Sequence, residues 1–470
     1  MNWFWRQIYR QYRLFSWVQY AASRRLTPAG GLLLGCLLLT LLMGINRETM
    51  VSYQAITLLL FLALSAPVAA LFFRVKVTVN RSLPRFGTVG QTTTYQVTIK
   101  NLTAQTQADL VLLEDLTDPR PTFAEWLALK QAERQTMRPF WLSGRPTALP
   151  RSLARLGQVR LPVLPPHREV EAHVEITPFR RGVLNWDGAT VARPDPFGLF
   201  HGLIKIPGPG KMLVLPRRYP LPPVALPGSL KYQEGGVALA AQVGQSEEFV
   251  ALRDYRHGDP LRHIHWRSWA RTGKPIVKEF EDEFFVRHAL VLDTFAGQPN
   301  SELFEEAVSV AASFACTIQT QESLLDLLFV GAEAYCFTAG RGLAHADQML
   351  EILASVQPCP RAPTPKVSHL EHFLTRRVAG SASIKTFADL EHLVLNHSAL
   401  VSNCICIFLA WDEPRRRLVE KLKTSGVPVL AVVLVAEPPK TPLDAGPLRD
   451  EPQCFHTLVL GDIEAGLQRL

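Results

Sequence analysis

The run ALVLD, residues 289–293, is followed by a stretch with helical periodicity from Glu302 to Gln319 and then by LLDLLFV, residues 324–330. Continuous apolar runs separated by helices predict parallel strands that are buried on both faces of a sheet. The alternation continues through AYCFT, helices near 345–356 and 386–398, CICIFLA, PRRRLVEKLKTSG, VPVLAVVLV and HTLVLG. Residues 286–470 are therefore predicted to form a doubly wound α/β domain.

Two acidic residues follow strands of this predicted sheet. Asp293 comes directly after ALVL, and Asp412 comes shortly after CICIFLA. Because ligands of doubly wound sheets bind in the crevice at the carboxyl ends of the strands, both residues are placed near that crevice.

Residues 74–220 have a different period. Apolar residues alternate with polar ones in VKVTVN (75–80), TYQVTIK (94–100) and EVEAHVEI (169–176), and further strands are expected near 109–113, 183–193 and 211–215. Strict alternation is typical of half-buried antiparallel strands, which predicts a β-sandwich. Between Arg134 and Arg160 it carries an insertion with six arginines and no acidic residue, interpreted either as a solvated loop or as a surface for anionic lipid or an acidic partner. The proline-rich YPLPPVALPGSL, residues 219–230, separates this domain from the next.

The longest apolar runs precede the sandwich. They are AGGLLLGCLLLTLLMGI, residues 29–45, and VSYQAITLLLFLALSAPVAALFF, residues 51–73. At about 1.5 Å per residue the second covers a hydrocarbon core of about 30 Å and the first barely does, so residues 29–73 are predicted to form a transmembrane helical hairpin. Arginines and lysines flank both outer ends, which predicts two spans with both termini and the soluble domains in the cytoplasm. No small-x-small pattern follows the first run, which argues against a cleaved signal peptide.

The amino-terminal segment, residues 1–28, is basic and aromatic. WFWRQIYRQYRLFSWVQY, residues 3–20, spaces Arg6, Arg10 and Arg13 helically among aromatic residues. Two interpretations stand side by side: a helix that lies along the membrane surface, or a frayed tail whose aromatic residues join the interfacial belt.

The composition gives little support for catalysis. The 470 residues carry a net charge of +8, no acidic residue precedes Glu48, and the seven cysteines form no CxxC pair, which fits a reducing compartment. The chain contains no GxxxxGK[ST], GxSxG or HExxH motif.

The stretch GDPLRHIHWRSWARTGKPIVKEF, residues 258–280, combines basic, aromatic and histidine residues. Zinc binding by His257, His263 and His265 is disfavoured by the surrounding cations, and nucleic-acid binding is disfavoured by the flanking acids Glu247, Glu248, Glu279, Glu281, Asp282 and Glu283. The favoured interpretation is a compact connector in which Phe249, Leu252, Trp266, Trp269 and Phe280 pack together while arginines hold neighbouring carboxylates through bidentate hydrogen bonds. A partner-binding face would be built on this connector.

A family resemblance rests on this region. SEEFVALRDYRHGDPLRHIHWRSWARTGKPIVKEFEDE, residues 246–283, resembles the signature segment of the domain of unknown function fifty-eight family. The matching positions are Phe249, Leu252, Arg253, Tyr255, Gly258, Asp259, Arg262, Ile264, Trp266, Ala270, Arg271, Val277, Lys278, Phe280 and Glu281. RRGVLNWDGATVARPDPFGLF, residues 180–200, also resembles the family, so the likeness covers essentially the whole chain.

The resemblance implies a fold and partners but no reaction. Its carboxyl-terminal part is similar to a von Willebrand factor A domain, and members are paired with MoxR-type AAA+ ATPases, often with a transglutaminase-like membrane protein, at the bacterial inner membrane. A metal site in such a domain uses D-x-S-x-S after the first strand, because Mg²⁺ prefers oxygen ligands. Here Asp293 is followed by Thr294, Phe295, Ala296 and Gly297. Only Asp293, Thr294 and Asp412 remain as weak metal candidates. Asp293 is expected instead either to cap the following turn or to accept hydrogen bonds at the strand end.

The sequence thus predicts a non-enzymatic, membrane-anchored scaffold or adaptor that works with a MoxR-type AAA+ ATPase in protein assembly or cell-envelope processes, without catalytic residues, cofactor or nucleic acid. The domains are expected at 1–28, 29–73, 74–220, 221–285 (linker and signature segment) and 286–470. The expected partner-binding residues are Arg253, Tyr255, Asp259, Arg262, Trp266, Arg267, Arg271 and Lys278. Two alternatives remain: a divalent-cation-dependent adhesion or assembly module, and a hydrolase that uses Asp254, Asp259 or the histidines.

Overall fold

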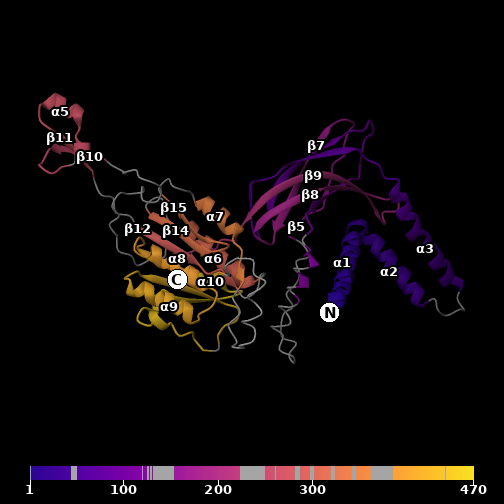
Figure 1. Cartoon of the computed structure of the whole chain (residues 1–470). Coiled ribbons are helices and arrows are strands. Elements are labelled where there is room, and N and C mark those ends of the chain that lie inside the picture. The colour runs from indigo at the N-terminus through magenta and orange to yellow at the C-terminus, as the bar shows by residue number, and fades with distance from the viewer. Residues whose placement is uncertain are drawn as a thin grey trace. The chain divides into compact units, whose positions relative to one another are not determined.

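The computed structural model describes residues 2–43, 50–118, 120–123, 126–127, 130, 153–222, 249–259, 261–280, 286–296, 301–318, 323–340, 346–360, 385–439 and 441–470. The chain divides into two compact units, Met1–Leu215 and Pro216–Leu470 (Figure 1). Each unit has a hydrophobic core of its own, so each is described by itself.

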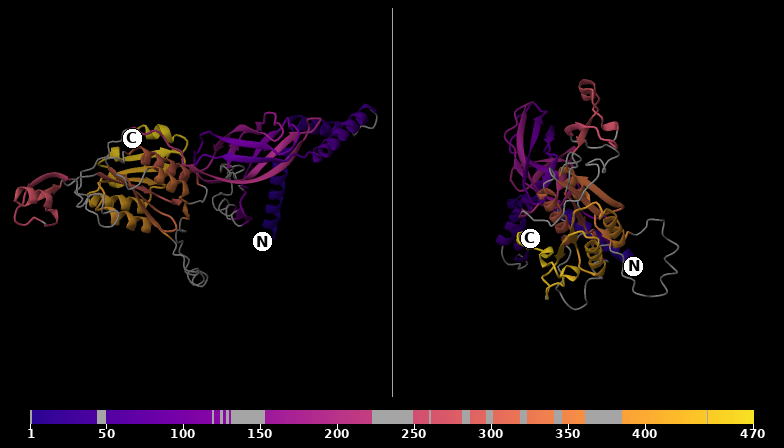
Figure 2. Two further views of the ribbon diagram at one scale, coloured as in Figure 1. Left: turned by 90° about the horizontal axis from the view of Figure 1, so that it is seen from above. Right: turned by 90° about the vertical axis from the view of Figure 1, so that its left-hand side faces the viewer.

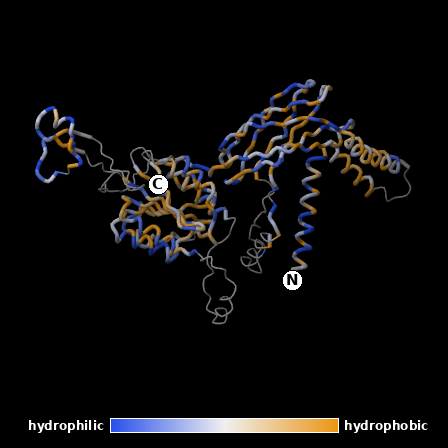
Figure 3. Tube along the Cα trace, turned by 45° about the horizontal axis from the view of Figure 1, so that its top comes forward, coloured by the Kyte–Doolittle hydropathy of each residue, from blue (hydrophilic) through white to orange (hydrophobic). Residues whose placement is uncertain are grey.

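The first unit begins with three helices, α1 (Asn2–Arg25), α2 (Pro28–Met43) and α3 (Met50–Leu71). Helices α2 and α3 are apolar all round, and Figure 3 shows them as almost continuously hydrophobic. They pack against each other through Leu33 and Ala66. Among the described helices, only α3 is long and apolar enough to cross a bilayer, through Tyr53–Ala70, and the apolar part of α2 is shorter.

The β-sandwich of the first unit has one sheet of four strands and one of five. The four-stranded sheet has the order β1 (Val77–Ser82), β3 (Thr93–Asn101), β7 (Glu169–Pro178), β5 (Ala154–Leu156). The second has the order β2 (Phe86–Thr88), β9 (His201–Leu215), β8 (Gly182–Pro194), β4 (Val111–Leu116), β6 (Val159–Arg160). All pairings are antiparallel except the short β2–β9 pair.

The alternating residues of the sequence form the core of the sandwich. Val97 and Ile99 of β3 and Val174 of β7 are completely buried, while their neighbours along each strand are more exposed. Tyr95 and Trp186 meet edge to face across the core with ring centroids 6.0 Å apart. The sandwich prediction is therefore confirmed in its inward-facing residues. Most of the predicted basic insertion, residues 131–152, lies outside the described residues.

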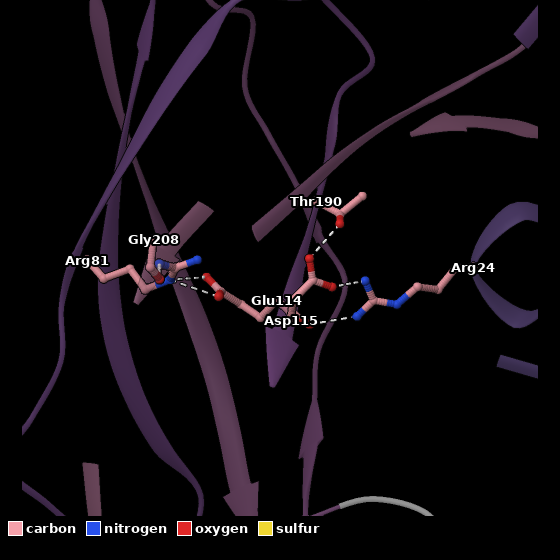
Figure 4. Close-up of polar contacts among 6 residues, drawn as sticks. All are labelled: Arg24, Arg81, Glu114, Asp115, Thr190 and Gly208. Carbon is pink, nitrogen blue, oxygen red and sulfur yellow. Dashed lines mark hydrogen bonds and ion pairs between the residues drawn. The ribbon is translucent and has the colours of Figure 1, made fainter. Parts of the chain in front are cut away.

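Two neighbouring acids of β4 are each held by an arginine (Figure 4). Glu114 accepts hydrogen bonds from Nε of Arg81 at 2.9 and 3.2 Å, and burial raises the pKa of Glu114 although Arg81 opposes this. Asp115 pairs with Arg24 and accepts a 2.7 Å hydrogen bond from Thr190. Because Arg24 belongs to the last turn of α1, this ion pair ties α1 to the sandwich.

The second unit contains a six-stranded sheet with the order β15 (Ala334–Ala339), β14 (Ser323–Val330), β12 (Val286–Leu292), β17 (Asn403–Phe408), β18 (Val429–Val435), β19 (Phe455–Val459). Its strands are parallel except β15, which runs antiparallel to β14 at one edge. The order reverses between β12 and β17, which makes their carboxyl ends the topological switch point. The doubly wound α/β prediction is confirmed by this strand order and these strand directions.

Helices cover the sheet on both faces. Helices α8 (Phe387–His397) and α9 (Glu413–Thr424) pack on the face formed by Ala289, Val291, Cys404 and Cys406. Helix α6 (Glu302–Thr317) contacts β12, β17 and β18 and packs against α7 (Ala346–Ser355), while α10 (Ile463–Leu467) contacts β19. The short elements are β13 (Phe295–Ala296), β16 (Cys359–Pro360), η5 (Gly446–Leu448) and η6 (Pro452–Cys454). Continuous burial of β14 and β17 explains their mainly apolar sequences, and the one charged residue of β14, Asp326, accepts hydrogen bonds from Arg287.

The signature segment forms a small hairpin module. Strands β10 (Phe249–Asp254) and β11 (Ile276–Phe280) pair antiparallel and enclose η2 (Leu261–His263) and α5 (Trp266–Thr272). We refer to residues 249–280 as the hairpin module.

Candidate functional site

The hairpin module is built on very few buried residues. Ile264 forms a bridge to Val277 of β11, and these two side chains are 6% and 2% exposed. Gly273 ends α5 in the left-handed conformation, with a φ of 72°, and its N–H donates to Trp269 O at 2.9 Å. This is the usual way for glycine to end a helix. The module therefore has a defined shape with room for only a small core.

A bidentate ion pair closes the turn after β10. Nη1 and Nη2 of Arg253 donate to the two carboxylate oxygens of Asp259 at 2.7 and 2.8 Å, and the N–H of Arg256 donates to Asp259 at 2.8 Å. The hydrogen bonds from Arg253 lower the pKa of Asp259 to about 2. The predicted clamp by an arginine is confirmed here. A carboxylate held so acidic is a poor general base near neutral pH, which weakens the hydrolase alternative for Asp259.

The packing predicted for the aromatic and aliphatic residues is wrong in part. Trp266 is 62% exposed and Leu252 is 42% exposed, because Ile264 and Val277 already fill the small interior. Trp266 instead stacks on Trp269, with ring centroids 5.3 Å apart and an interplanar angle of 20°. The side chains of Phe249 and Phe280 lie outside the described part.

Helix α5 carries an exposed strip of mixed character. Trp266, Arg267, Ala270 and Arg271 are all exposed, and the i, i+4 spacing places them on one side of the helix. Leu261, 67% exposed, immediately precedes it in η2. Trp and Arg are the residue types most often found at the energetic centres of protein interfaces. The strip is thus a candidate protein-docking surface.

The other predicted partner-binding residues lie elsewhere in the hairpin module. Nε of Arg262 donates to His263 at 3.2 Å, and the N–H of Tyr255 donates to Pro275 O at 3.0 Å across the hairpin. Lys278 is half-buried on β11. The His265 ring contacts the Ser268 hydroxyl at 2.6 Å. Within the described ranges, no three His, Cys, Asp or Glu side chains gather where they could hold a metal ion.

The switch point of the sheet is the second predicted site, and its acids meet an arginine. Asp293 is completely buried, and its Oδ2 accepts hydrogen bonds from Nε of Arg415 at 2.8 Å and from the N–H of Leu409 at 3.1 Å. The N–H of Phe295 donates to its other oxygen at 3.0 Å. Nη1 of Arg415 donates to Asp412 at 2.6 Å. The structure therefore brings Asp293 and Asp412 together around one guanidinium.

This arrangement does not fit a divalent cation. Arg415 already supplies the positive charge between the two carboxylates, and Thr294 turns its hydroxyl away to donate to Val330 O at 2.5 Å. Burial by itself lowers the pKa of Arg415. The negative charges and hydrogen bonds of Asp293 and Asp412 outweigh this effect, so the pKa of Arg415 is raised. Burial also raises the pKa of Asp293, against the effects of Arg415 and the two N–H donors. The guanidinium lies 4.7 Å from the centre of the Phe387 ring, which completes its enclosure.

Sequence reasoning missed Arg415. The available signal was the i, i+3 spacing of Asp412 and Arg415 at the start of a helix that directly follows a strand end. Three consecutive arginines concealed it, because only burial distinguishes Arg415 from the half-buried Arg416 and the exposed Arg417.

Comparison with known proteins identifies the region of the hairpin module. Residues 251–385 match the family described as "Protein of unknown function DUF58", which confirms the predicted resemblance for this region, while residues 180–200 lie outside the match. An uncharacterized protein of Bacillus subtilis (strain 168), YeaD, is 32% identical over 126 residues, which is 26% of this chain. The alignment spans 31% of the relative's length.

Solved structures resemble this chain only weakly. A Salmonella alpha-2-macroglobulin has a TM-score of 0.18 at 14% identity and covers 36% of this chain and 9% of its own. The PapD-like domain of human CEP192 has a TM-score of 0.16 at 11% identity and covers 30% of this chain and 86% of its own. Likenesses at these scores carry no argument about fold or function.

Proposed function

We propose that this chain, which carries the DUF58 match at residues 251–385, is a membrane-anchored scaffold without enzymatic activity that docks a protein partner through its hairpin module. The observation that carries the proposal is the exposed Trp266–Arg271 strip on a module whose own carboxylate, Asp259, is already engaged by Arg253. Because Asp259 is held by Arg253, it does not neutralise Arg267 or Arg271. These two arginines remain exposed, beside Trp266, for contact with another molecule.

The hairpin of α2 and α3 is the proposed anchor, with two spans. Its outward side chains are large and apolar: Leu32, Leu38, Leu39, Leu42, Leu58, Phe61, Leu64 and Val68 are all exposed. Helix α2 has 16 residues, about 24 Å, so it needs local thinning of the bilayer or a supporting partner helix to cross. Its pairing with α3 through Leu33 and Ala66 supplies that support.

Charges on the flanks orient the anchor. Arg24 and Arg25 precede α2, and Arg74 and Lys76 follow α3, so both outer ends are placed in the cytoplasm. The sandwich and the α/β unit follow α3 and belong on the same side. A bacterial inner membrane is the setting that the family resemblance suggests.

The proposed partner presents an acidic surface with an apolar pocket. Arg267 and Arg271 suit carboxylates, and Trp266 suits the pocket, since tryptophan buries a large area with few rotatable bonds. The family resemblance makes a MoxR-type AAA+ ATPase the first candidate, with a transglutaminase-like membrane protein as a further member of the assembly.

The finer fold assignment, a von Willebrand factor A-like domain without a working metal site, belongs to the same proposal. Its support is the doubly wound sheet with an acidic residue, Asp293, directly after β12 at the switch point. Arg415 occupies the space between the carboxylates, so binding would use side-chain surfaces rather than a bridging metal.

Membrane topology tests the anchor. In spheroplasts, external protease is expected to leave both soluble units intact, and alkaline carbonate is expected to leave the full chain in the membrane pellet. Lysed spheroplasts are the control, since the same protease must then cleave the chain. Digestion of the α/β unit from outside, or release of the chain by carbonate, would contradict the proposal.

A further inference from the structure

Helix α1 has one face covered by its own unit. Tyr9 packs against Phe123 and Trp126 with ring centroids 5.4 and 5.6 Å apart, and its hydroxyl donates to Pro121 O at 2.9 Å. Trp5 lies edge to face with Trp126, which is 2% exposed. These contacts hold α1 as a packed helix along its amino-terminal half, contrary to the interpretation of this segment as a frayed tail.

The opposite face of α1 is apolar and exposed. It carries Trp3, Phe4, Leu14, Phe15, Trp17 and Val18, all of which are exposed. Leu14 and Val18 are four residues apart, and Phe15 and Val18 are three apart, so they lie together on one side of the helix. A water-facing helix of a globular domain rarely presents so many large apolar groups on one side.

The charges around this face all have one sign. Arg10, Arg13 and Arg25 are exposed on α1, and no acidic residue occurs before Glu48. Large apolar side chains combined with arginines are typical of helices that lie in the interface of anionic membranes. An acidic protein surface would offer the charge but not the extended apolar layer.

The corner between α1 and α2 is fixed to the sandwich. Only Leu26 and Thr27 separate the helices, and Thr27 donates from N to Leu199 O at 3.1 Å and from Oγ1 to Gly198 O at 2.6 Å. A Cβ on Gly30 would meet Leu199 O at 2.1 Å, so the start of α2 approaches the sandwich too closely for any other residue. Figures 1 and 2 show α1 turning away from the α2–α3 hairpin at this corner. The exposed face of α1 therefore begins where the proposed anchor enters the bilayer.

We propose that α1 lies in the interface of a bilayer that contains anionic phospholipid, with Leu14, Phe15, Trp17 and Val18 inserted among the headgroups and upper acyl chains. The inference rests on the proposed anchoring of α2 and α3, with which the apolar face of α1 is continuous. The Arg24–Asp115 pair transmits this placement to the sandwich, so the membrane sets the orientation of the whole first unit rather than only tethering it.

A fluorescent probe at two adjacent positions tests this placement. The full chain, with the exposed cysteines Cys36, Cys316 and Cys336 replaced, receives V18C or Q19C, is labelled with an environment-sensitive dye and is reconstituted into vesicles with or without anionic lipid. Val18 lies on the apolar face, and Gln19, also exposed, lies about 100° around the helix. The background without an introduced cysteine controls for labelling of the buried thiols.

The dye at position 18 is expected to emit at shorter wavelength than the dye at 19 and to be quenched by aqueous iodide about threefold less, with a larger difference in anionic vesicles. Equal quenching at both positions, in vesicles from which carbonate does not release the chain, would overturn the interfacial helix and leave the anchor standing. Release of the chain by carbonate would overturn both the interfacial placement of α1 and the proposed membrane anchor. Protection of position 18 that appears only when a second protein is added would assign the face to a protein and also overturn the inference.

Discussion

The switch point of the α/β unit and the hairpin module use the same pair of residue types to opposite effect. At the switch point Arg415 bridges Asp293 and Asp412 inside the protein, and nothing of Asp293 reaches the surface. In the hairpin module Arg253 and Asp259 only close a turn, and a strip with Trp266, Arg267 and Arg271 remains exposed beside them. The comparison teaches that the usual ligand-binding place of a doubly wound fold is closed here by Arg415, while the proposed docking surface lies on the hairpin module.

Removing the buried arginine should give the largest effect. R415A leaves the carboxylate of Asp293 buried without its partner, which is expected to cost about 3–5 kcal/mol of stability. R417A is the matched control, because Arg417 is exposed, pairs with Glu413 alone among the described residues and is expected to contribute less than about 1 kcal/mol. Urea unfolding of the detergent-solubilised chain measures both variants. Equal effects would mean that the switch point is not closed in the way described.

Because Arg415 fills the switch point, we expect this site not to bind divalent cations. Titration of the wild-type chain with Mn²⁺ in a calorimeter is expected to give only the heat of dilution, because Arg415 already provides the charge that the metal would bring. Tight uptake that D293A abolishes would restore the cation-dependent adhesion or assembly alternative.

The smallest expected effect is the dependence of the hairpin module's stability on pH. The folded pKa of Asp259, about 2, lies below its ordinary value of 3.8, so the stability contributed by this ionised carboxylate is complete above that ordinary value and is lost as pH falls towards 2. The carboxyl carbon resonance of Asp259, assigned by its absence in D259N, should therefore titrate near pH 2. A midpoint near 3.8 would show that the clamp by Arg253 does not form in solution.

Much of the fold could be predicted because the spacing of apolar residues along the chain follows from which side chains are buried. The alternation around Val97 and Val174 indicated the sandwich, and the continuous apolar run at Ile405 and Ile407 indicated a strand buried on both faces. The crevice acids Asp293 and Asp412 were also placed correctly at strand ends. These features depend on local sequence, which is why the sequence was sufficient.

The sequence did not reveal an ion pair between residues that are distant in the chain, and it led to a wrong prediction of burial in a module with a small interior. Arg415 could not be paired with Asp293 from the sequence, since 122 positions separate them and the contact depends on how β12 and β17 adjoin. Trp266 was expected inside because it is aromatic, but a two-stranded module has no interior large enough for it once Ile264 and Val277 are placed. Exposure of Trp266 became visible only with the structure.

The most direct test of the scaffold hypothesis is the affinity of the reconstituted full chain for a purified MoxR-type AAA+ ATPase, measured by surface plasmon resonance on nanodiscs. Wild type is expected to bind, and W266S with R267E is expected to lose at least about tenfold in affinity while keeping its unfolding midpoint, since both side chains are exposed. K274E, also exposed in the same module but outside the strip, is the matched control and should bind as wild type does. No binding by the wild type, or equal binding by W266S with R267E, would contradict the account.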